Sequence, residues 1–254
     1  MKYTIFIFVI FLISNITIAR SIGETEIITD EGIEVFQKEK YYLLKKNVRI
    51  SSDDFSLSGN YIKVFFGENL YDISQIEAKE DVELKSKETS ISSNGQNLNF
   101  DIKNQKLLVF GRGSELFIDN IKMFSDEKIE VNNVSGKFIL YGENSRLVGD
   151  NIFIRADFID GIFINESKGK KIDFLFVSDK NISYVKSDNT EMYAKNIRFD
   201  NKSSLIELED DVKIIRDGEI ITGGYGSLNT KTNSYKIKSN PDKKVKVIIS
   251  NDDK

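Results

Sequence analysis

The sequence predicts an all-β fold in which antiparallel hairpins stack into an elongated body. Apolar and polar residues alternate along much of the chain, as in Asn97-Leu98-Asn99-Phe100. This period of two turns one face of each strand inward and the other toward water. Clusters of turn-forming residues separate the alternating runs. No convincing stretch combines a helical period with capping residues.

The expected strands run from Tyr42 to Ile249. The clearest alternating runs are 42–50, 97–102, 196–199 and 244–247, and the expected turns are 51–54, 93–95, 111–113, 144–145, 217–218 and 229–230. Residues 125–131 come nearest to a helix, with Ser125 in the N-cap position. Lys128 stands where a capping box needs Glu or Gln, and the alternation of Ile129 and Val131 favours a strand.

Two short patterns recur along the chain. In the first, an acid or amide precedes Val, a charged residue and a second aliphatic residue; its copies are 47–50, 81–84 and 211–214. In the second, a small residue precedes apolar residues at the third and fifth positions; its copies begin at Gly59, Gly95, Gly149 and Ala194, with a shifted copy near Gly224. The small residue predicts a tight corner, where another strand comes close. The unequal spacing of the copies predicts hairpins of variable length rather than a fixed-period β-helix.

Composition excludes several kinds of chemistry. The 254 residues include no His and no Cys, so catalytic triads, thiol nucleophiles, imidazole or thiolate zinc sites and disulfides are ruled out. The net charge of −4 argues against a nucleic-acid partner. The carboxylate clusters at 53–54, 209–211 and 252–253 fall at expected turns or in the tail and match no calcium loop. We therefore expect no enzymatic activity, no metal and no cofactor.

Residues 1–19 predict a signal peptide. Lys2 precedes an unbroken apolar run at 5–13 and a boundary of small residues, with cleavage expected after Ala19 or after Ser21. The alternative is a retained membrane anchor, but the apolar run is shorter than the ~20 residues of a membrane span. We expect a single elongated domain over residues 22–249 and a mobile tail at 250–254.

In their order along the chain and in their residue pattern, these motifs resemble the LptA/OstA family of periplasmic lipopolysaccharide-transport proteins. The resemblance is most detailed in the last sixty or so residues, at 192–199, 205–218, 220–225, 235–237 and 243–249. Family members usually carry Gly before the Asn-Val pair, whereas this chain has Lys46, Glu80 and Asp210 there. The resemblance implies an open β-jellyroll whose apolar interior carries lipid, and a periplasmic location, or a membrane-anchored one if the signal is retained.

If the resemblance holds, inward apolar residues of the strands bind the acyl chains of lipopolysaccharide. The alternative for each of them is that it fills a closed core. The expected lipid-binding residues are Val48, Ile50, Ile62, Val64, Val82, Leu84, Leu98, Phe100, Ile152, Ile154, Ile197, Phe199, Val212 and Ile214.

The implied partners are lipopolysaccharide or lipid A, together with LptC-like inner-membrane and LptD-like outer-membrane jellyroll domains. These domains would dock by adding strands at the edges, and end-to-end self-association would use the same edges. The expected docking edges are residues 25–28 and 244–249. Lysines at 243, 244 and 246 would equally suit a gatekeeper edge that prevents aggregation. Two alternative functions stay open: an LptC-like anchored relative, and an exported structural or adhesive β-repeat protein that binds no lipid.

Overall fold

The computed structural model describes residues 25–70, 72–86, 90–149, 151–167, 169–232 and 234–249. The expected signal peptide and tail lie outside these residues, so both stay predictions. Every regular element in the described ranges is a strand, and the strands form one 18-stranded sheet. In order they are β1 (Glu26–Ile28), β2 (Ile33–Phe36), β3 (Tyr41–Ser51), β4 (Phe55–Phe66), β5 (Ile73–Ser86), β6 (Ile91–Asp101), β7 (Lys106–Phe110), β8 (Ser114–Ile118), β9 (Ile121–Ser125), β10 (Lys128–Asn132), β11 (Lys137–Val148), β12 (Ile152–Glu166), β13 (Gly169–Ser187), β14 (Thr190–Asp200), β15 (Leu205–Arg216), β16 (Glu219–Asn229), β17 (Ser234–Lys238) and β18 (Lys246–Ile249).

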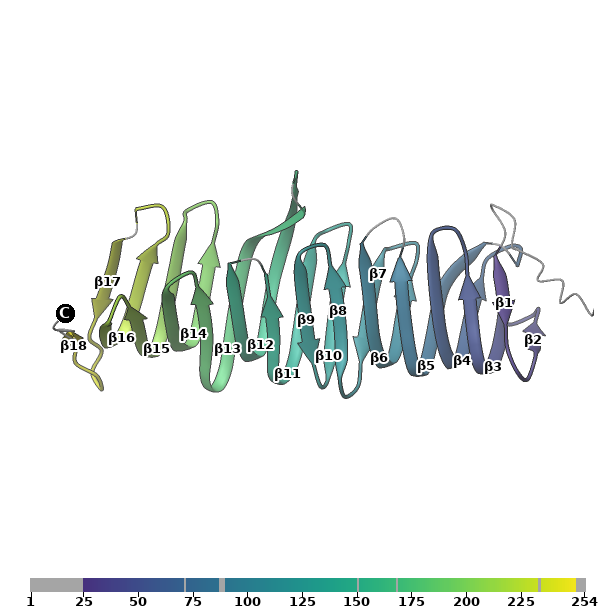
Figure 1. Cartoon of the computed structure of the whole chain (residues 1–254), viewed down its shortest axis with the longest axis horizontal. Coiled ribbons are helices and arrows are strands. Elements are labelled where there is room, and N and C mark those ends of the chain that lie inside the picture. The colour runs from purple at the N-terminus through teal and green to yellow at the C-terminus, as the bar shows by residue number, and fades with distance from the viewer. Residues whose placement is uncertain are drawn as a thin grey trace, which may run out of the picture.

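Most strands pair antiparallel with the next strand along the chain, so the body grows as a row of hairpins (Figure 1). Residues 128–132 form β10, as their alternation predicts. The predicted fold class, an all-β open jellyroll of stacked antiparallel hairpins, is confirmed.

The sheet is folded along its length into two facing walls. The β1 wall contains β1, β8, β9 and β18 with residues 48–51, 55–58, 82–86, 91–95, 145–148, 152–156, 183–187, 190–194, 212–216 and 219–223 of the long strands. The β2 wall contains β2, β7, β10 and β17 with the other halves of those strands. Each long strand therefore crosses from one wall to the other at a corner near its middle.

The corners form where strands adopt left-handed backbone conformations. Lys46 and Asn47 have φ of 64° and 49°, Glu80 and Asp81 have 61° and 55°, and Asp210 has 61°. At the last corner Asp211 follows with 58°. At each of these corners the strand register shifts. The recurring acid-or-amide before Val is thus the second residue of a corner. The position before it, where the resembling family has Gly, is left-handed as well, a conformation that Gly adopts without strain.

The predicted small residues lie opposite these bends, with one exception. Gly59 pairs with Val48, Gly95 with Val82, and Ala194 with Ser183. Gly149 is the exception, because it precedes β12 and lies in the turn at the end of the wall. The turns predicted at 93–95 and 144–145 are also wrong, because β6 and β11 run through them. The small residues Ser93 and Gly95 face the opposite wall rather than reverse the chain.

The core fills the space between the walls. Side chains such as Phe138, Leu44, Ile62 and Leu147 are completely buried, and one apolar cluster extends from Tyr42 to Leu228. Phe138 stacks on Phe163 with ring centroids 4.0 Å apart. Since the described residues include no disulfide, this burial is the main stabilising contribution.

Candidate functional site

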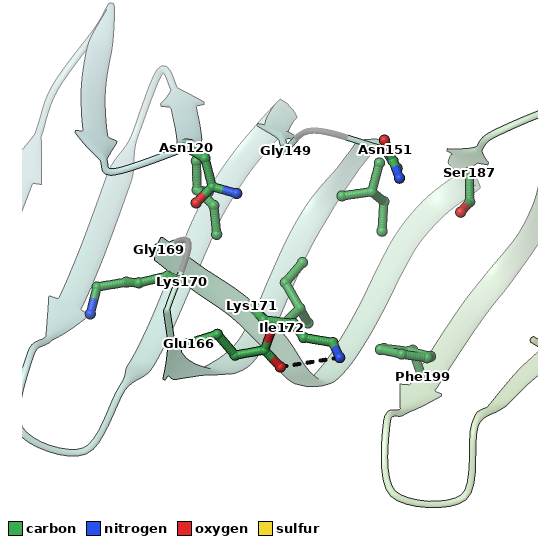
Figure 2. A pocket seen from close by; sticks show the side chains of 12 residues that line it. Asn120, Gly149, Asn151, Glu166, Gly169, Lys170, Lys171, Ile172, Ser187 and Phe199 are labelled. Carbon is green, nitrogen blue, oxygen red and sulfur yellow. Dashed lines mark ion pairs between the residues drawn. The ribbon is translucent and has the colours of Figure 1, made fainter.

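The free edges of the two walls, opposite the corners, leave a cleft of about 430 Å³ near the middle of the body (Figure 2). From the β1 wall, the cleft is lined by residues in turns and at strand ends, at 120–121, 149, 151–152 and 187. From the β2 wall, it is lined by the β12–β13 hairpin and the end of β14. The lining residues are Asn120, Ile121, Gly149, Asn151, Ile152, Glu166, Gly169, Lys170, Lys171, Ile172, Ser187 and Phe199.

The β12–β13 hairpin extends beyond its neighbours and bends over the mouth (Figure 1). The bend coincides with a register shift: Ile162 pairs with Phe174, but Phe163 pairs with Ile172, which leaves Asp173 as the extra residue. Such a bulge bends a strand and re-aims its side chains. As a result the hairpin reaches the opposite wall, where a Cβ on Gly169 would lie 3.1 Å from Asn120 Oδ1.

The cleft is amphipathic. Its apolar part consists of Ile121, Ile152, Ile172 and Phe199, of which Ile121 and Ile172 belong to the buried core and the other two pack against it. The polar part includes the ion pair between Lys171 Nζ and Glu166 Oε1, 3.3 Å apart (Figure 2). An apolar floor under a polar rim suits an amphiphile, whose tail is apolar and whose head is hydrated.

Lys170 adds a cation beside the cleft without a carboxylate partner in the described ranges. Its Nζ donates to Asn165 Oδ1 at 2.9 Å and to Asn133 Oδ1 at 3.4 Å. Because both acceptors are neutral amides, they orient the ammonium group and leave its positive charge uncompensated.

A second cleft of about 310 Å³ continues along the same mouth toward the C-terminal end. It shares Ser187 with the first, and Ile206 and Leu228 of the β2 wall lie opposite Asp188 and Asp217 of the β1 wall. The two clefts together form an opening alongside β12 to β16.

The fourteen predicted lipid-binding residues all belong to or pack against the apolar cluster between the walls. Eleven are buried, whereas Phe100, Ile152 and Phe199 are partly exposed near the free edges. Only Ile152 and Phe199 line the first cleft. Side chains such as Ile62, Val64 and Ile154 have no exposed surface, so the walls touch around them and a chain-sized slot does not run beside them. Binding of lipid by the fourteen therefore remains a prediction.

Sequence reasoning missed Ile121, Ile172 and the Glu166–Lys171 pair. These residues meet because the hairpin bends at Asp173, and a bulge leaves only a one-residue break in the alternation of 169–178 as a signal.

Each end of the body presents two edge strands, one from each wall. At the N-terminal end β1 and β2 both pair with β3, and at the C-terminal end β17 and β18 both pair with β16. The predicted edges at 25–28 and 244–249 correspond to β1 and β18, while β2 and β17 were not anticipated. Ile28 at one end and Val247 at the other are each 51% exposed.

In the described ranges, no group of three or more carboxylates is arranged to hold a metal ion. No helix there is long and apolar enough to cross a membrane.

Comparisons with known proteins give one kind of match. No family model matches the chain, and no curated protein matches it either. Among solved structures, the chain is similar to LptH from Pseudomonas aeruginosa, described as the LptA-homologous periplasmic component of the lipopolysaccharide transport device. The identity is 14% and the TM-score 0.42, over 52% of this chain and 98% of that one.

Proposed function

We propose that this protein is a periplasmic carrier that shelters the acyl chains of lipopolysaccharide and passes the lipid toward the outer membrane. The observation that supports the proposal most is the amphipathic cleft, whose floor is continuous with the core between the walls. The sequence resemblance described above points to the same function.

The physical need for such a carrier follows from the hydrophobic effect. Each CH₂ group kept from water is worth ~0.8 kcal/mol, so one chain of about 12 carbons represents ~10 kcal/mol. A tail lying on Ile152 and Phe199 would recover part of that free energy. The polar rim at Glu166, Lys170 and Lys171 would remain with the hydrated headgroup.

Deeper binding requires the walls to separate at the mouth. Strand pairing in the described ranges runs within each wall, and the chain passes between the walls at the corners. Apolar contacts hold the interior together, and an acyl chain can replace these contacts with equivalent ones of its own. We therefore propose that the predicted residues Ile154 and Ile197 contact lipid once the walls have parted.

Partners would dock at the ends. The exposed edges of β1, β2, β17 and β18 can accept a further strand. We propose LptC-like and LptD-like domains, or a second copy of this chain, as the donors of that strand.

The structural or adhesive alternative also has an observation in its favour. Completely buried side chains such as Phe138 and Leu140 fill the interior, which is what a scaffold without a ligand requires. The LptC-like alternative depends on retention of residues 1–19, which lie outside the described part of the chain.

Photo-crosslinking in cells separates carrier from scaffold. A photoreactive phenylalanine analogue at Phe199 or Ile152 should form adducts with lipopolysaccharide. The same analogue at Phe176 is the control, because Phe176 lies on the outer face of the β2 wall, where Arg198 Cζ is 5.9 Å from the ring centroid. Adducts with protein alone at the cleft positions, or equal lipid adducts at Phe176, would contradict the proposal.

A further inference from the structure

The outer face of the β1 wall carries aromatic rings and cations in a continuous row. Consecutive register pairs join Phe124 to Arg146, Arg146 to Arg155, Arg155 to Tyr184, Tyr184 to Tyr193 and Tyr193 to Lys213, and the row continues through Thr222 to Lys246. The residues between them, such as Leu147, Ile154 and Val185, are buried in the core, so the row faces solvent.

The rings hold the cations in place. Arg146 Cζ lies 5.0 Å from the Phe124 ring centroid, Arg155 Cζ 5.8 Å from that of Tyr184, and Lys213 Nζ 5.2 Å from that of Tyr193. A cation over a ring keeps its hydrogen-bonding groups free for a partner. Burial and a hydrogen bond from Tyr193 Oη to Glu191 raise the pKa of Tyr193 to about 12, so its ring stays neutral.

A second row runs beside the first, closer to the free edge, and is mainly apolar. Register pairs join Phe117 to Lys122, Lys122 to Val148 and Val148 to Phe153. The Lys186–Glu191 ion pair then interrupts the apolar residues, which resume with Ile215, Ile220 and Ile248. The face therefore consists of a basic stripe and an apolar stripe side by side, over roughly 35 Å at the usual spacing of strands.

The positive charge on this face is largely uncompensated. The outward cations in the two rows are Lys122, Arg146, Arg155, Lys186, Lys213 and Lys246, and the outward carboxylates are Glu115 and Glu191. Within the described ranges Lys186 pairs with Glu191 at 3.6 Å, and no ion pair engages the other five cations. On the outer face of the β2 wall, Lys45, Lys106 and Lys137 each pair with a carboxylate, whereas Lys63 and Lys79 are held over rings and engage no ion pair in the described ranges.

We infer that this face of the β1 wall binds the surface of an anionic phospholipid membrane. Cations that reach lipid phosphates beside aromatic and aliphatic side chains at the level of the headgroups form the pattern of interfacial binding. A soluble acidic polymer would need the basic stripe alone, whereas the apolar stripe matches the hydrocarbon boundary below the headgroups. The whole chain carries a charge of −4, so attraction at this face would also fix its orientation on the membrane.

This inference does not depend on what the cleft carries, and vesicle co-sedimentation tests it separately. The chain from residue 22 onward, which lacks the apolar run at 5–13, should bind vesicles of phosphatidylcholine with phosphatidylglycerol, bind pure phosphatidylcholine weakly, and dissociate as salt is raised. The double variant Arg155→Glu with Lys213→Glu should lower partitioning by about tenfold or more. Circular dichroism and thermal melts would establish that it is folded.

The β2 wall supplies a matched control. Lys63→Glu with Lys79→Glu changes the net charge equally and also removes cations held over rings, those of Tyr41 at 3.9 Å and Tyr61 at 5.7 Å. This control should bind vesicles as the unmodified chain does. Equal losses in the two double variants, or equal binding to both kinds of vesicle, would overturn the inference.

An uncharged change separates a membrane from an acidic polymer. Phe153→Ser shortens the apolar stripe without altering charge, and it should weaken vesicle binding several-fold. Binding to soluble polyglutamate with none to vesicles would assign the face to an acidic polymer and would also overturn the inference.

Discussion

Gly95 on the β1 wall faces Val109 on the β2 wall so closely that a Cβ on Gly95 would lie 2.7 Å from Val109 Cγ1. Both residues flank a corner, where the two walls converge. Close approach of the walls, rather than turn formation, therefore explains this glycine.

Gly95→Ala should destabilise the fold by about 1–3 kcal/mol, because the β-branched Val109 cannot move aside without disturbing the core. Asn94→Ala, on the exposed side of the same strand, should change stability by less than about 0.5 kcal/mol. Urea unfolding of the two variants measures the difference. Equal stabilities of Gly95→Ala and Asn94→Ala would show that the two walls move apart at this corner to accommodate the added methyl group.

Which residues of each strand face inward could be predicted from sequence, because burial alternates residue by residue. Val82 and Leu84 face inward in β5 as their pattern requires. The corners could not be predicted in the same way. A bend inside a strand and a turn between strands use the same residue types, so Ser93-Asn94-Gly95 suggested a turn where β6 continues. At Gly149 the small residue does lie in a turn, although the pattern predicted a corner.

The candidate site was less predictable than the strands. Periodicity identified Ile152 and Phe199 as inward residues. It could not show that they lie at the mouth, because the exposure of an inward side chain depends on how far along its strand it lies from the corner. Ile172 comes to the cleft through the bulge at Asp173. Such a site depends on how strands end, which a pattern of alternation does not encode.

Lys46 and Arg49 provide a paired test of the corner. Both are exposed on β3 and both carry one positive charge, but only Lys46 has a positive φ, of 64°. Lys46→Gly relieves about 1 kcal/mol of left-handed strain and so should be neutral or stabilising. Arg49→Gly should lower the free energy of unfolding by about 0.5–1 kcal/mol, because glycine loses more conformational entropy on folding and position 49 has no left-handed strain to relieve. Thermal melts should rank the variants in that order, and a reversed order would rule out strain at this corner.

Gly169 tests the contact between the β12–β13 hairpin and the opposite wall. Its φ of 118° disfavours any side chain, and a Cβ there would meet Asn120. Gly169→Ala should therefore lift the hairpin and expose Ile172. The chain has no cysteine, so Ile172→Cys provides a unique thiol. Its labelling by a maleimide should become several-fold faster.

Gly218→Ala is the control for Gly169, since Gly218 also has a positive φ, of 82°, but lies in the β15–β16 turn with open space around it. Labelling at position 172 should be unchanged in that background. Acceleration by both changes would mean general loosening rather than movement of the hairpin.

Asp211 links a corner to the loop between β17 and β18. A hydrogen bond from Lys243 holds the pKa of the Asp211 carboxyl below its usual 3.8, and Lys195 Nζ, 3.5 Å away, acts in the same direction. A lowered pKa stabilises the fold above pH 3.8, and this contribution is lost as the pH falls through the folded-state value. Because the groups are exposed, it is below about 1 kcal/mol.

Asp211→Asn should therefore lower stability slightly at pH 7 and make no difference at pH 2, by urea unfolding at each pH. Asp210→Asn, at the neighbouring corner position, controls for the tolerance of Asn for left-handed backbone. A larger effect of Asp211→Asn in acid than at neutral pH would contradict the assigned ion pairs.

The two ends of the body carry opposite charges, which predicts head-to-tail association. Glu26, Asp30, Glu31 and Glu34 surround β1 and β2, whereas Lys236, Lys238, Lys244 and Lys246 surround β17 and β18. Sedimentation velocity should show association that rises with concentration and weakens with salt. Lys236→Glu with Lys244→Glu should reduce it by about tenfold. Lys103→Glu with Lys202→Glu, in the exposed turns between β6 and β7 and between β14 and β15, changes the net charge equally and should leave association unchanged. If both pairs reduce association alike, overall charge rather than pairing of the edge strands controls it.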